Sequence, residues 1–518
     1  MLADKTIISS NAYNQACEIL PEKINIEPFT MVIFGGTGDL SQRKLLPTLY
    51  HLCIDQNLPD DFSIIGFASS ERSDENYRDL VKNAIQEFGD DPTEGECWEK
   101  FSKHIYFVSG RFDDKESYEK LSRRLEEVAI VSGDGKKEII YYLAVPPQFL
   151  PDIFERLSFC KLCKGTYDTR AIIEKPFGRD RPSAIELNRL VASSFDENQI
   201  YRIDHYLGKE TVQNILFFRF ANSIFEPLWN RQYIDHVQIT VSESIGIENR
   251  ARFYDKAGVV RDIVQNHIMQ LLSLVAMEPP IGFEADHIRN EKVKVYNTIR
   301  SMDEEYIDRF TVRGQYDEGL VNDKKVAGYR QEKDIPPDSD TPTYFAGKLY
   351  IDNWRWAGVP FYLRTGKRLK RRITEISIHF KQPPLRLFSS TCEIREPNVL
   401  VLGVQPQEEI VMHIGVKHPG IGNQLYPVNM GFRYERDLKG DVHYPLAYER
   451  LLLDCMKGDQ TLFARQDGVE AMWTIVDPIV KRWKNTPAPE FPNYSAGQWG
   501  PAEADDLMKK DGRQWRIC

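Results

Sequence analysis

The stretch Met31-Val-Ile-Phe-Gly-Gly-Thr-Gly-Asp-Leu-Ser-Gln-Arg-Lys-Leu-Leu46 joins a short apolar run to a glycine-rich turn and then to a helical pattern. Glycine lets the chain turn tightly and lets a pyrophosphate approach the backbone, and the first N–H groups of the following helix attract phosphates. Gly35, Gly38 and Ser41 stand where a larger side chain would obstruct the turn. A plain tight turn is the alternative, but its place after the first apolar strand favours a dinucleotide site. Pro47 predicts that this helix ends early or kinks.

Short apolar runs recur from Phe29 to about Ile200, separated by helix-length segments. They are 31–34, 63–67, 104–108, 139–143 and 171–173. Such runs are typical of parallel strands that are buried on both faces and joined by crossover helices. This part of the chain is therefore expected to form a Rossmann-like, doubly wound parallel sheet.

The rhythm changes after about residue 201. Helical stretches at roughly 208–220 and 261–278 are followed by alternating segments at 235–243, 375–380, 399–403 and 409–414. Alternation predicts a large, mainly antiparallel sheet that is covered on one face, hence an α+β domain. Residues 320–345 are polar and proline-rich and are expected to form a surface loop. The predicted organisation is an N-terminal arm (1–28), a dinucleotide-binding domain (29–200) and an α+β domain (201–518).

Composition narrows the classes of partner. The chain of 518 residues is 42% hydrophobic and 28% charged, with a formal net charge of −10. This balance argues against nucleic acid as the main partner, although a local basic cluster can still bind a small anion.

Cys160 and Cys163 form a C-x-x-C without a second pair, so no metal site is predicted. The N-terminus lacks a signal pattern and the apolar runs are too short to span a membrane, so a cytoplasmic protein is expected.

The second strand gives a weak signal about the dinucleotide. It ends in Phe67-Ala-Ser-Ser-Glu-Arg72, without an acid directly after it to bind a ribose 2′-hydroxyl. This mildly favours NADP, with Arg72 or Arg43 near the 2′-phosphate. Glu71 weakens the inference, and NAD stays possible.

Ionisable residues cluster in two places that could bind a ligand. Lys175, in Glu-Lys-Pro-Phe-Gly, follows the strand at 171–173 and so lies where open α/β sheets bind ligands; a solvated surface lysine is the alternative. His205 and Lys209 would share a face if a helix begins there, and could clamp a phosphate. The alternative is an ordinary charged helix start.

Three further features could contribute to a site. His267 lies on an apolar helical stripe, where it is either a hydrogen-bonded core residue or a general base oriented by a carboxylate. Glu243 ends an alternating strand. The basic run 363–372 is either a solvated surface or an anion site.

Taken together, these motifs resemble the glucose-6-phosphate dehydrogenase family from about residue 29 to about residue 515. The most specific motif is Asp-His-Tyr-Leu-Gly-Lys at 204–209. Others are the Gly-x-x-Gly-Asp-Leu turn, Glu-Lys-Pro-Phe-Gly, Gln265-Asn-His267, Arg364-Thr-Gly-Lys367 and Gly500-Pro-Ala-Glu-Ala-Asp505.

The resemblance implies oxidation of glucose 6-phosphate at C1 by hydride transfer to NADP, which gives 6-phosphogluconolactone and begins the oxidative pentose phosphate pathway. His267 would be the general base and Asp204 would orient it. Substrate contacts are implied for Lys175, His205, Tyr206, Lys209, Glu243, Asp262, Lys367 and Arg372. Coenzyme contacts are implied for Gly35, Gly38, Asp39, Leu40, Ser41, Lys44, Ser69, Arg72 and Lys175. No metal is implied. A homodimer or homotetramer is expected, with the α+β domain at 201–518 as the substrate and dimerisation domain.

Two departures from the family pattern bear on the coenzyme. NADP-specific members commonly carry Arg where this chain has Ser69, so use of NAD is possible. Gly403, Val411 and His413 replace the residues with which some members bind a second, structural NADP, so that site is predicted to be absent or weak.

Two other functions fit part of the pattern. One is an oxidoreductase of the broader Rossmann and Glu-Lys-Pro class that acts on another sugar, which His205 and Lys209 argue against. The other is a non-catalytic NADP-binding sensor, which would have no use for Asp204 and His267.

Overall fold

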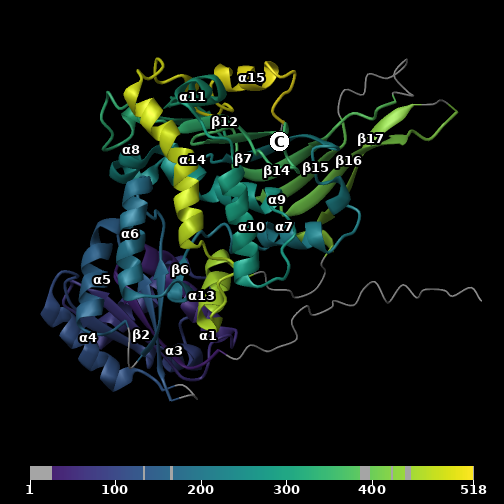
Figure 1. The fold of residues 1–518 in the computed structure, drawn as a ribbon. Coiled ribbons are helices and arrows are strands. Elements are labelled where there is room, and N and C mark those ends of the chain that lie inside the picture. The colour runs from purple at the N-terminus through teal and green to yellow at the C-terminus, as the bar shows by residue number, and fades with distance from the viewer. Residues whose placement is uncertain are drawn as a thin grey trace, which may run out of the picture.

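The computed structural model describes residues 26–131, 135–163, 167–385, 397–421, 424–437 and 445–516, so the predicted arm lies outside it except for residues 26–28. A parallel sheet in the order β3-β2-β1-β4-β5-β6 forms the lower part of the molecule (Figure 1). Its strands are β1 (Phe29–Phe34), β2 (Phe62–Ala68), β3 (Ile105–Ser109), β4 (Lys137–Leu143), β5 (Tyr167–Ile173) and β6 (Ile200–Arg202). Its helices are α1 (Leu46–Ile54), α2 (Asp74–Phe88), α3 (Glu96–Ser102), α4 (Lys115–Val128), α5 (Leu150–Phe159) and α6 (Arg181–Ser194). Every residue of β1 and β2 is buried, as expected of strands with helices on both faces.

The second sheet has the order β17-β16-β15-β14-β7-β13-β12-β8. Its strands are β7 (Ile234–Ser242), β8 (Thr311–Gly314), β12 (Tyr344–Tyr350), β13 (Pro360–Gly366), β14 (Ile373–Phe380), β15 (Val399–Gln405), β16 (Glu409–Lys417) and β17 (Leu425–Arg433). All neighbours pair antiparallel except β7 and β13, which are parallel. The two sheets confirm the predicted fold class.

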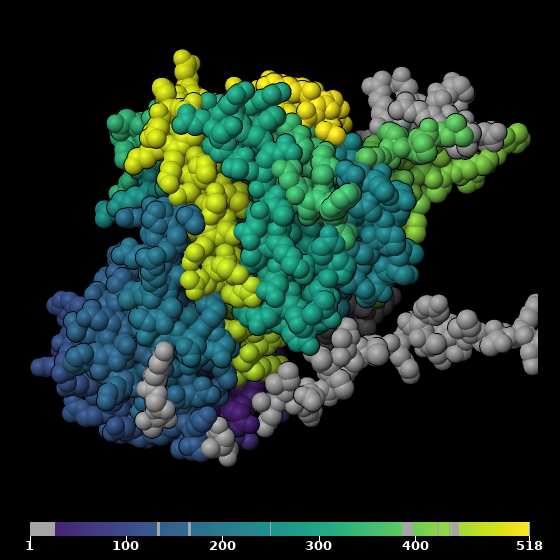
Figure 2. Space-filling view, in the orientation of Figure 1, coloured from purple at the N-terminus to yellow at the C-terminus, as the bar shows by residue number. Residues whose placement is uncertain are grey.

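Helices cover the second sheet and connect it to the first. They are α7 (Glu210–Phe220), α8 (Ala251–Val259), α9 (Met269–Ala276), α10 (Ala285–Thr298), α11 (Glu304–Phe310), α12 (Tyr434–Asp437), α13 (Ala447–Lys457), α14 (Gln466–Asn485) and α15 (Ala502–Lys509). In Figure 2 the yellow-green segment that contains α14 runs from the upper part of the molecule down to the blue N-terminal part. Asn188 of α6 donates a hydrogen bond to Glu470 of α14, which ties the two parts together.

Several sequence predictions were wrong in detail. Of the two alternatives for Pro47, an early end of the helix is wrong, because α1 continues to Ile54. The helix is irregular just before the proline, where a π-helical segment, η2 (Ser41–Leu45), widens it and accommodates the missing N–H. No helix joins His205 to Lys209, because residues 204–208 form turns and α7 starts at Glu210. The loop predicted at 320–345 contains β10 (Gly319–Val321), β11 (Lys324–Val326) and the buried Tyr329. The central strands β7 and β13 are buried on both faces rather than one, because the C-terminal residues cover the second face.

Candidate active site

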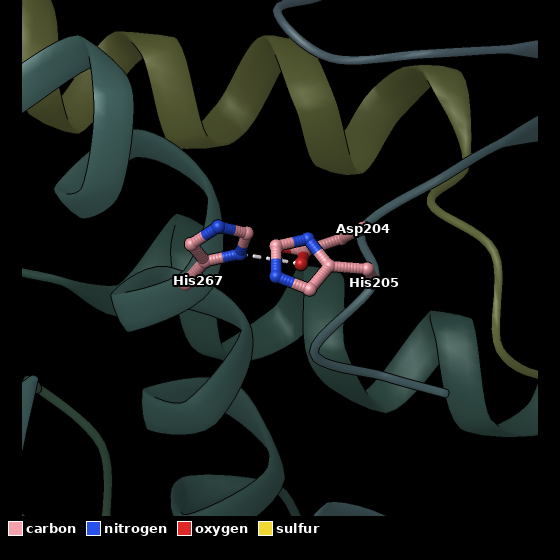
Figure 3. A group of neighbouring side chains, drawn as sticks. All are labelled: Asp204, His205 and His267. Carbon is pink, nitrogen blue, oxygen red and sulfur yellow. Dashed lines mark hydrogen bonds and ion pairs between the residues drawn. The ribbon is translucent and has the colours of Figure 1, made fainter. Parts of the chain in front are cut away.

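A histidine and an aspartate from distant segments meet between the two sheets. Asp204 follows β6, and His267 lies in the π-helical segment η7 (Val260–Ile268). His267 Nδ1 and Asp204 Oδ1 are 2.5 Å apart, and both side chains are almost fully buried (Figure 3). The Tyr206 backbone N–H donates to the same Asp204 oxygen at 3.0 Å. The carboxylate is therefore fixed by two donors, and the imidazole is fixed by the carboxylate.

The π-helical geometry determines what lies beside His267. Asp262 and His267 are five residues apart, and in an α-helix their side chains would point about 140° apart. In a π-helix, residues i and i+5 are hydrogen-bonded neighbours, so the two side chains lie on one side. Lys175 contacts both: its Nζ lies 2.8 Å from His267 Nε2 and 3.2 Å from the Asp262 carbonyl oxygen. The widened helix thus brings the base and a carboxylate to the same lysine.

The hydrogen bonds assign the protonation of His267. Burial lowers its pKa, Asp204 opposes this, and Lys175 lowers it further, so the pKa lies below its ordinary value. Burial also favours protonated Asp204, but His267, His205 and Lys175 more than offset it and hold the Asp204 pKa well below its usual range. A neutral imidazole that donates from Nδ1 to a carboxylate and accepts at Nε2 follows. Nε2 is the nitrogen that could take a proton from a substrate.

A second set of charges lies next to this pair. The Lys367 ammonium is fully buried, contacts Glu243 Oε2 and lies 3.6 Å from Asp262 Oδ2. Burial raises the pKa of Asp262, but Lys175, Lys367 and Arg250 together lower it to about 2. We call Lys175, Asp204, Glu243, Asp262, His267 and Lys367 the charged pocket. Its carboxylate oxygens can accept hydrogen bonds and its lysines can donate them, which suits the hydroxyl groups of a sugar.

Basic and aromatic side chains adjoin the charged pocket near β14 and β15. The Tyr206 ring stacks on His267 with ring centroids 4.1 Å apart. Lys209 donates to Gln405 Oε1, which also lies 3.4 Å from an Arg372 nitrogen. Burial and Arg372 lower the pKa of Lys209 to about 8. This arrangement can bind a phosphate, with Lys209 and Arg372 supplying the charge.

His205 differs from its predicted role as a cation. Burial, His267 and Lys175 hold its pKa well below the ordinary value, so its imidazole is neutral here. Its ring lies edge-on to His267, with centroids 4.6 Å apart. His205 can therefore contribute hydrogen bonds rather than charge to a phosphate.

Sequence reasoning missed residues that the structure brings to the site. Gln405 links Lys209 and Arg372 to Thr374, to which its amide donates at 3.0 Å. Arg250 lies 3.7 Å from Asp262. Glu174, next to Lys175, accepts hydrogen bonds from the hydroxyls of Tyr142 and Tyr448. Gln405, Tyr142 and Tyr448 carry no charge pattern and Arg250 lies in no motif, so only distance in the fold could identify them.

The glycine turn, residues 35–38, lies where the strand order reverses between β1 and β4. Gly35 has φ +80°, and a Cβ there would lie 2.5 Å from the Ala144 carbonyl oxygen. Gly38 N–H donates to Gly35 O, and helical residues begin at Asp39. The tight turn therefore requires glycine at Gly35, and its place at the topological switch point, just before a helix start, fits a dinucleotide pyrophosphate.

The other predicted coenzyme residues surround this turn. The Ser41 hydroxyl donates to Gly35 O at 2.9 Å, and Leu40 is half-buried, whereas Asp39 and Lys44 are exposed. Ser69 and Arg72 follow β2 and are exposed. Arg43 is held by Asp39 at 2.8 Å and lies over the Phe88 ring. In the described ranges the Arg72 guanidinium forms no ion pair, so it is the freer candidate for a 2′-phosphate.

The sequence predicts that a metal ion is absent and that a second NADP site is absent or weak. Asp204, His205 and His267 could each offer a metal ligand atom, all within 4.8 Å of one another. Both nitrogens of His267 are already hydrogen-bonded, however, and the Lys175 ammonium would repel a cation, so the geometry fits proton transfer better than metal binding. Of the residues tied to a second NADP site, His413 donates from Nδ1 to Asn429 Oδ1 at 2.6 Å, and Val411 packs with Val399 and Val401. Within the described residues, no helix is long and apolar enough to cross a membrane.

Comparison with known proteins covers nearly the whole chain. Residues 32–214 match the family model "Glucose-6-phosphate dehydrogenase, NAD binding domain" and residues 216–516 match "Glucose-6-phosphate dehydrogenase, C-terminal domain". The glucose-6-phosphate 1-dehydrogenase of Chlamydia pneumoniae is 46% identical over 498 residues, which cover 94% of this chain and 96% of that protein. The Bacillus subtilis protein of that name is 42% identical, covering 95% and 99%.

Two solved structures of glucose-6-phosphate dehydrogenases also superpose on this chain. A glucose-6-phosphate dehydrogenase in complex with its substrate glucose-6-phosphate superposes with a TM-score of 0.84 at 32% identity and covers 94% of this chain and 98% of that one. The glucose-6-phosphate 1-dehydrogenase of Mycobacterium avium gives a TM-score of 0.80 at 34% identity, covering 94% and 99%.

Proposed function

The chain belongs to the glucose-6-phosphate dehydrogenase family, and from that premise we propose that it oxidises glucose 6-phosphate at C1 to 6-phosphogluconolactone, with NADP as hydride acceptor. The observation that carries the proposal is the 2.5 Å contact between His267 Nδ1 and Asp204 Oδ1 beside Lys175. Oxidation of a hydroxyl to a carbonyl requires a proton acceptor, and this pair supplies one.

The role proposed for each residue of the charged pocket follows from its charge. His267 removes the proton of the C1 hydroxyl through Nε2, and Asp204 stabilises the imidazolium that forms. Lys175 leaves Nε2 as the sugar enters and donates to a substrate oxygen. Glu243, Asp262 and Lys367 hold the remaining hydroxyls, which fixes C1 in one orientation.

The residues around the glycine turn fit the dinucleotide, with the pyrophosphate against Gly35, Gly38 and Ser41 and the nicotinamide near Lys175. When bound, NADP supplies the C4 position that accepts the hydride from C1. The exposed Ser69 and Arg72 border the adenosine ribose, so they set the preference between NADP and NAD.

Specificity for a phosphorylated sugar rests on Lys209 and Arg372, which Gln405 holds together, with His205 and Tyr206 beside them. An enzyme for unphosphorylated sugars would leave these cations without a partner, and a sensor would have no use for the buried base. Neither alternative is favoured.

Initial rates with glucose 6-phosphate and with glucose, each with NADP and with NAD, test the function. We expect NADP reduction with glucose 6-phosphate and a kcat/KM at least about 1,000-fold lower with glucose, because loss of the phosphate leaves the Lys209 and Arg372 cations without their anionic partner. Equal rates with both sugars would refute the phosphosugar assignment.

The chain is further inferred to form homodimers, or tetramers built from them, through the second sheet. Support comes from an apolar groove of about 450 Å³ between α7 and the strands β15 to β17, lined among others by Phe217, Phe218, Met412 and Met430. Light scattering during size exclusion tests this, and a monomer at micromolar concentration would refute it. A cytoplasmic location is proposed as well, which cell fractionation tests.

A further inference from the structure

The loop after β13 carries Lys367 on a strained backbone. Arg368, directly after Lys367, has φ +50°, a left-handed conformation that residues other than glycine rarely adopt. Such a conformation persists only where the surrounding structure enforces it, and it is concentrated at functional sites. The group that this loop presents is the fully buried Lys367 ammonium, which contacts Glu243 and lies 3.6 Å from Asp262. Whatever enforces the loop therefore bears on the charged pocket.

One side of the loop is held by the end of β7. The Arg368 N–H donates to the Ile245 carbonyl oxygen at 3.1 Å, and the Leu369 N–H donates to that of Glu243 at 2.9 Å. These bonds fix the loop next to Glu243. The carbonyl oxygens of Lys367 and Arg368 still require donors, because a buried backbone acceptor without a partner destabilises the fold.

Those donors come from residues 494–499, which we call the strap. The Tyr494 hydroxyl donates to the Lys367 carbonyl oxygen at 2.8 Å. The Gly497 N–H donates to the Arg368 carbonyl oxygen, also at 2.8 Å. The strap, far along the chain from β13, therefore completes the hydrogen bonding of the strained loop.

The strap is itself closely fitted to its surroundings. Gly497 has φ +88°, and a Cβ there would collide with the Leu320 carbonyl oxygen. The buried Arg364 guanidinium lies over two indole rings, 4.7 Å from the ring centre of Trp499 in the strap and 4.6 Å from that of Trp515. Such stacking of a desolvated cation on aromatic rings is attractive. Since Arg364 lies on β13, the stack ties the strap to the strand that leads into the loop.

Tyr494 is the strap residue whose hydroxyl reaches the loop. It is only 5% exposed, and its hydroxyl also lies 3.0 Å from Thr343 Oγ1. The Thr343 carbonyl oxygen accepts the N–H of Lys367 at 3.0 Å. Both backbone groups of Lys367 are thus held, the N–H by Thr343 and the carbonyl oxygen by Tyr494.

We propose that Tyr494 is a positioning residue for the reaction: its hydroxyl, held in place by the strap, fixes the backbone of Lys367 so that the ammonium group lies in the charged pocket. The inference rests on the proposed function, because it matters only if Lys367 binds the sugar. It also accounts for the left-handed Arg368, since the loop can relax once the bond to Tyr494 is absent.

The test removes one hydroxyl and keeps the ring. Tyr494→Phe is compared with Tyr344→Phe, because the Tyr344 ring lies 5.6 Å from that of Tyr494 and its buried hydroxyl has no hydrogen-bond partner in the described residues. For Tyr494→Phe we expect kcat/KM for glucose 6-phosphate to fall about tenfold, because a buried carbonyl loses its donor and Lys367 is no longer fixed. KM for NADP should stay within about twofold, since the glycine turn belongs to the first sheet. Tyr344→Phe should match the wild type.

A double-mutant cycle separates this role from a general effect on the fold. If Tyr494 acts through Lys367, its hydroxyl has nothing left to position in Lys367→Met. In that background, Tyr494→Phe should lower kcat/KM by less than about twofold rather than by about tenfold.

Equal losses in the two backgrounds, or an unchanged kcat/KM in Tyr494→Phe, would overturn the inference and leave the proposed function intact. A rise in KM for NADP as large as the loss for the sugar would overturn it too. Failure of Tyr494→Phe to fold would have the same meaning, since the hydroxyl would then serve the whole fold. A wild type without activity on glucose 6-phosphate would instead refute the proposed function, and this inference with it.

Discussion

The glycine turn and the charged pocket are built from the chain in different ways. The turn is local: one strand end and the helix after it supply backbone N–H groups, and the side chains nearby are largely exposed. The charged pocket is assembled from the ends of β5, β7 and β13, the turn after β6 and η7, and its charges are buried against one another. The difference teaches that the coenzyme site depends on the absence of side chains, whereas the reaction depends on their exact charge.

The largest effect is expected in the charged pocket. His267→Asn should lower kcat by about 10²–10⁴, because the proton acceptor is lost while the fold keeps a polar residue of similar size. KM for the coenzyme should stay close to the wild-type value. His287→Asn, on the exposed part of α10, is the control and should leave kcat unchanged. A kcat within fivefold of the wild type for His267→Asn would mean that another group accepts the proton.

The next effect is expected in the glycine turn. Gly35→Ala adds a Cβ that would lie 2.5 Å from the Ala144 carbonyl oxygen, at a φ of +80°. Displacing the turn should weaken coenzyme binding by roughly 100-fold, measured by fluorescence titration. Gly95→Ala is the control: its φ is +91° but nothing lies within 4 Å of the added Cβ, so it carries the backbone strain without the collision. Equal coenzyme affinity in the two variants would show that the turn tolerates a side chain.

A third prediction compares two lysines, Lys175 next to His267 and Lys209 at the proposed phosphate site. His267 has a pKa below its ordinary value of 6.5, so the acid limb of kcat/KM should lie below pH 6.5 in the wild type. Lys175→Met removes a positive charge next to Nε2, which raises the pKa of His267 and should move that limb to higher pH. Lys209→Met should raise KM for glucose 6-phosphate by roughly tenfold without moving the limb, because we assign Lys209 to the substrate phosphate rather than to the base. Coincident profiles for wild type and Lys175→Met would contradict the assignment of the base.

The smallest effect is expected at the exposed rim of the coenzyme site. Arg72→Ala should raise KM for NADP by about two- to fivefold and leave KM for NAD unchanged, because an exposed ion pair contributes about 0.2–1 kcal/mol. Arg43→Ala should change neither value, since Asp39 and Phe88 already hold that guanidinium. The reverse result would place the 2′-phosphate against Arg43.

The parts of the fold that follow from local patterns could be predicted. Strands such as Met31–Phe34 are continuous apolar runs, and the glycine turn follows from residues next to one another in the chain. β6, β12 and β13 were missed because they are short or mix polar and apolar residues while both faces are buried. Pro47 suggested the end of a helix because the wider turn before it leaves no mark in the sequence.

The site was less accessible to sequence reasoning for a related reason. Nothing in the residue types distinguishes a π-helix from an α-helix, so an apolar stripe at the α-helical period was assigned where η7 is buried at nearly every residue. Burial of His205, which makes its imidazole neutral, depends on residues far along the chain.

The helix α14 ties residues near the end of the chain to the coenzyme domain. The Trp473 indole N–H donates to the carbonyl oxygen of Phe177, two residues after Lys175, and the Arg181 N–H donates to Asp477. The loop that carries Lys175 therefore lacks these hydrogen bonds during translation until α14 has been synthesised. Expressed alone, the coenzyme domain would lack both hydrogen bonds from α14 to this loop.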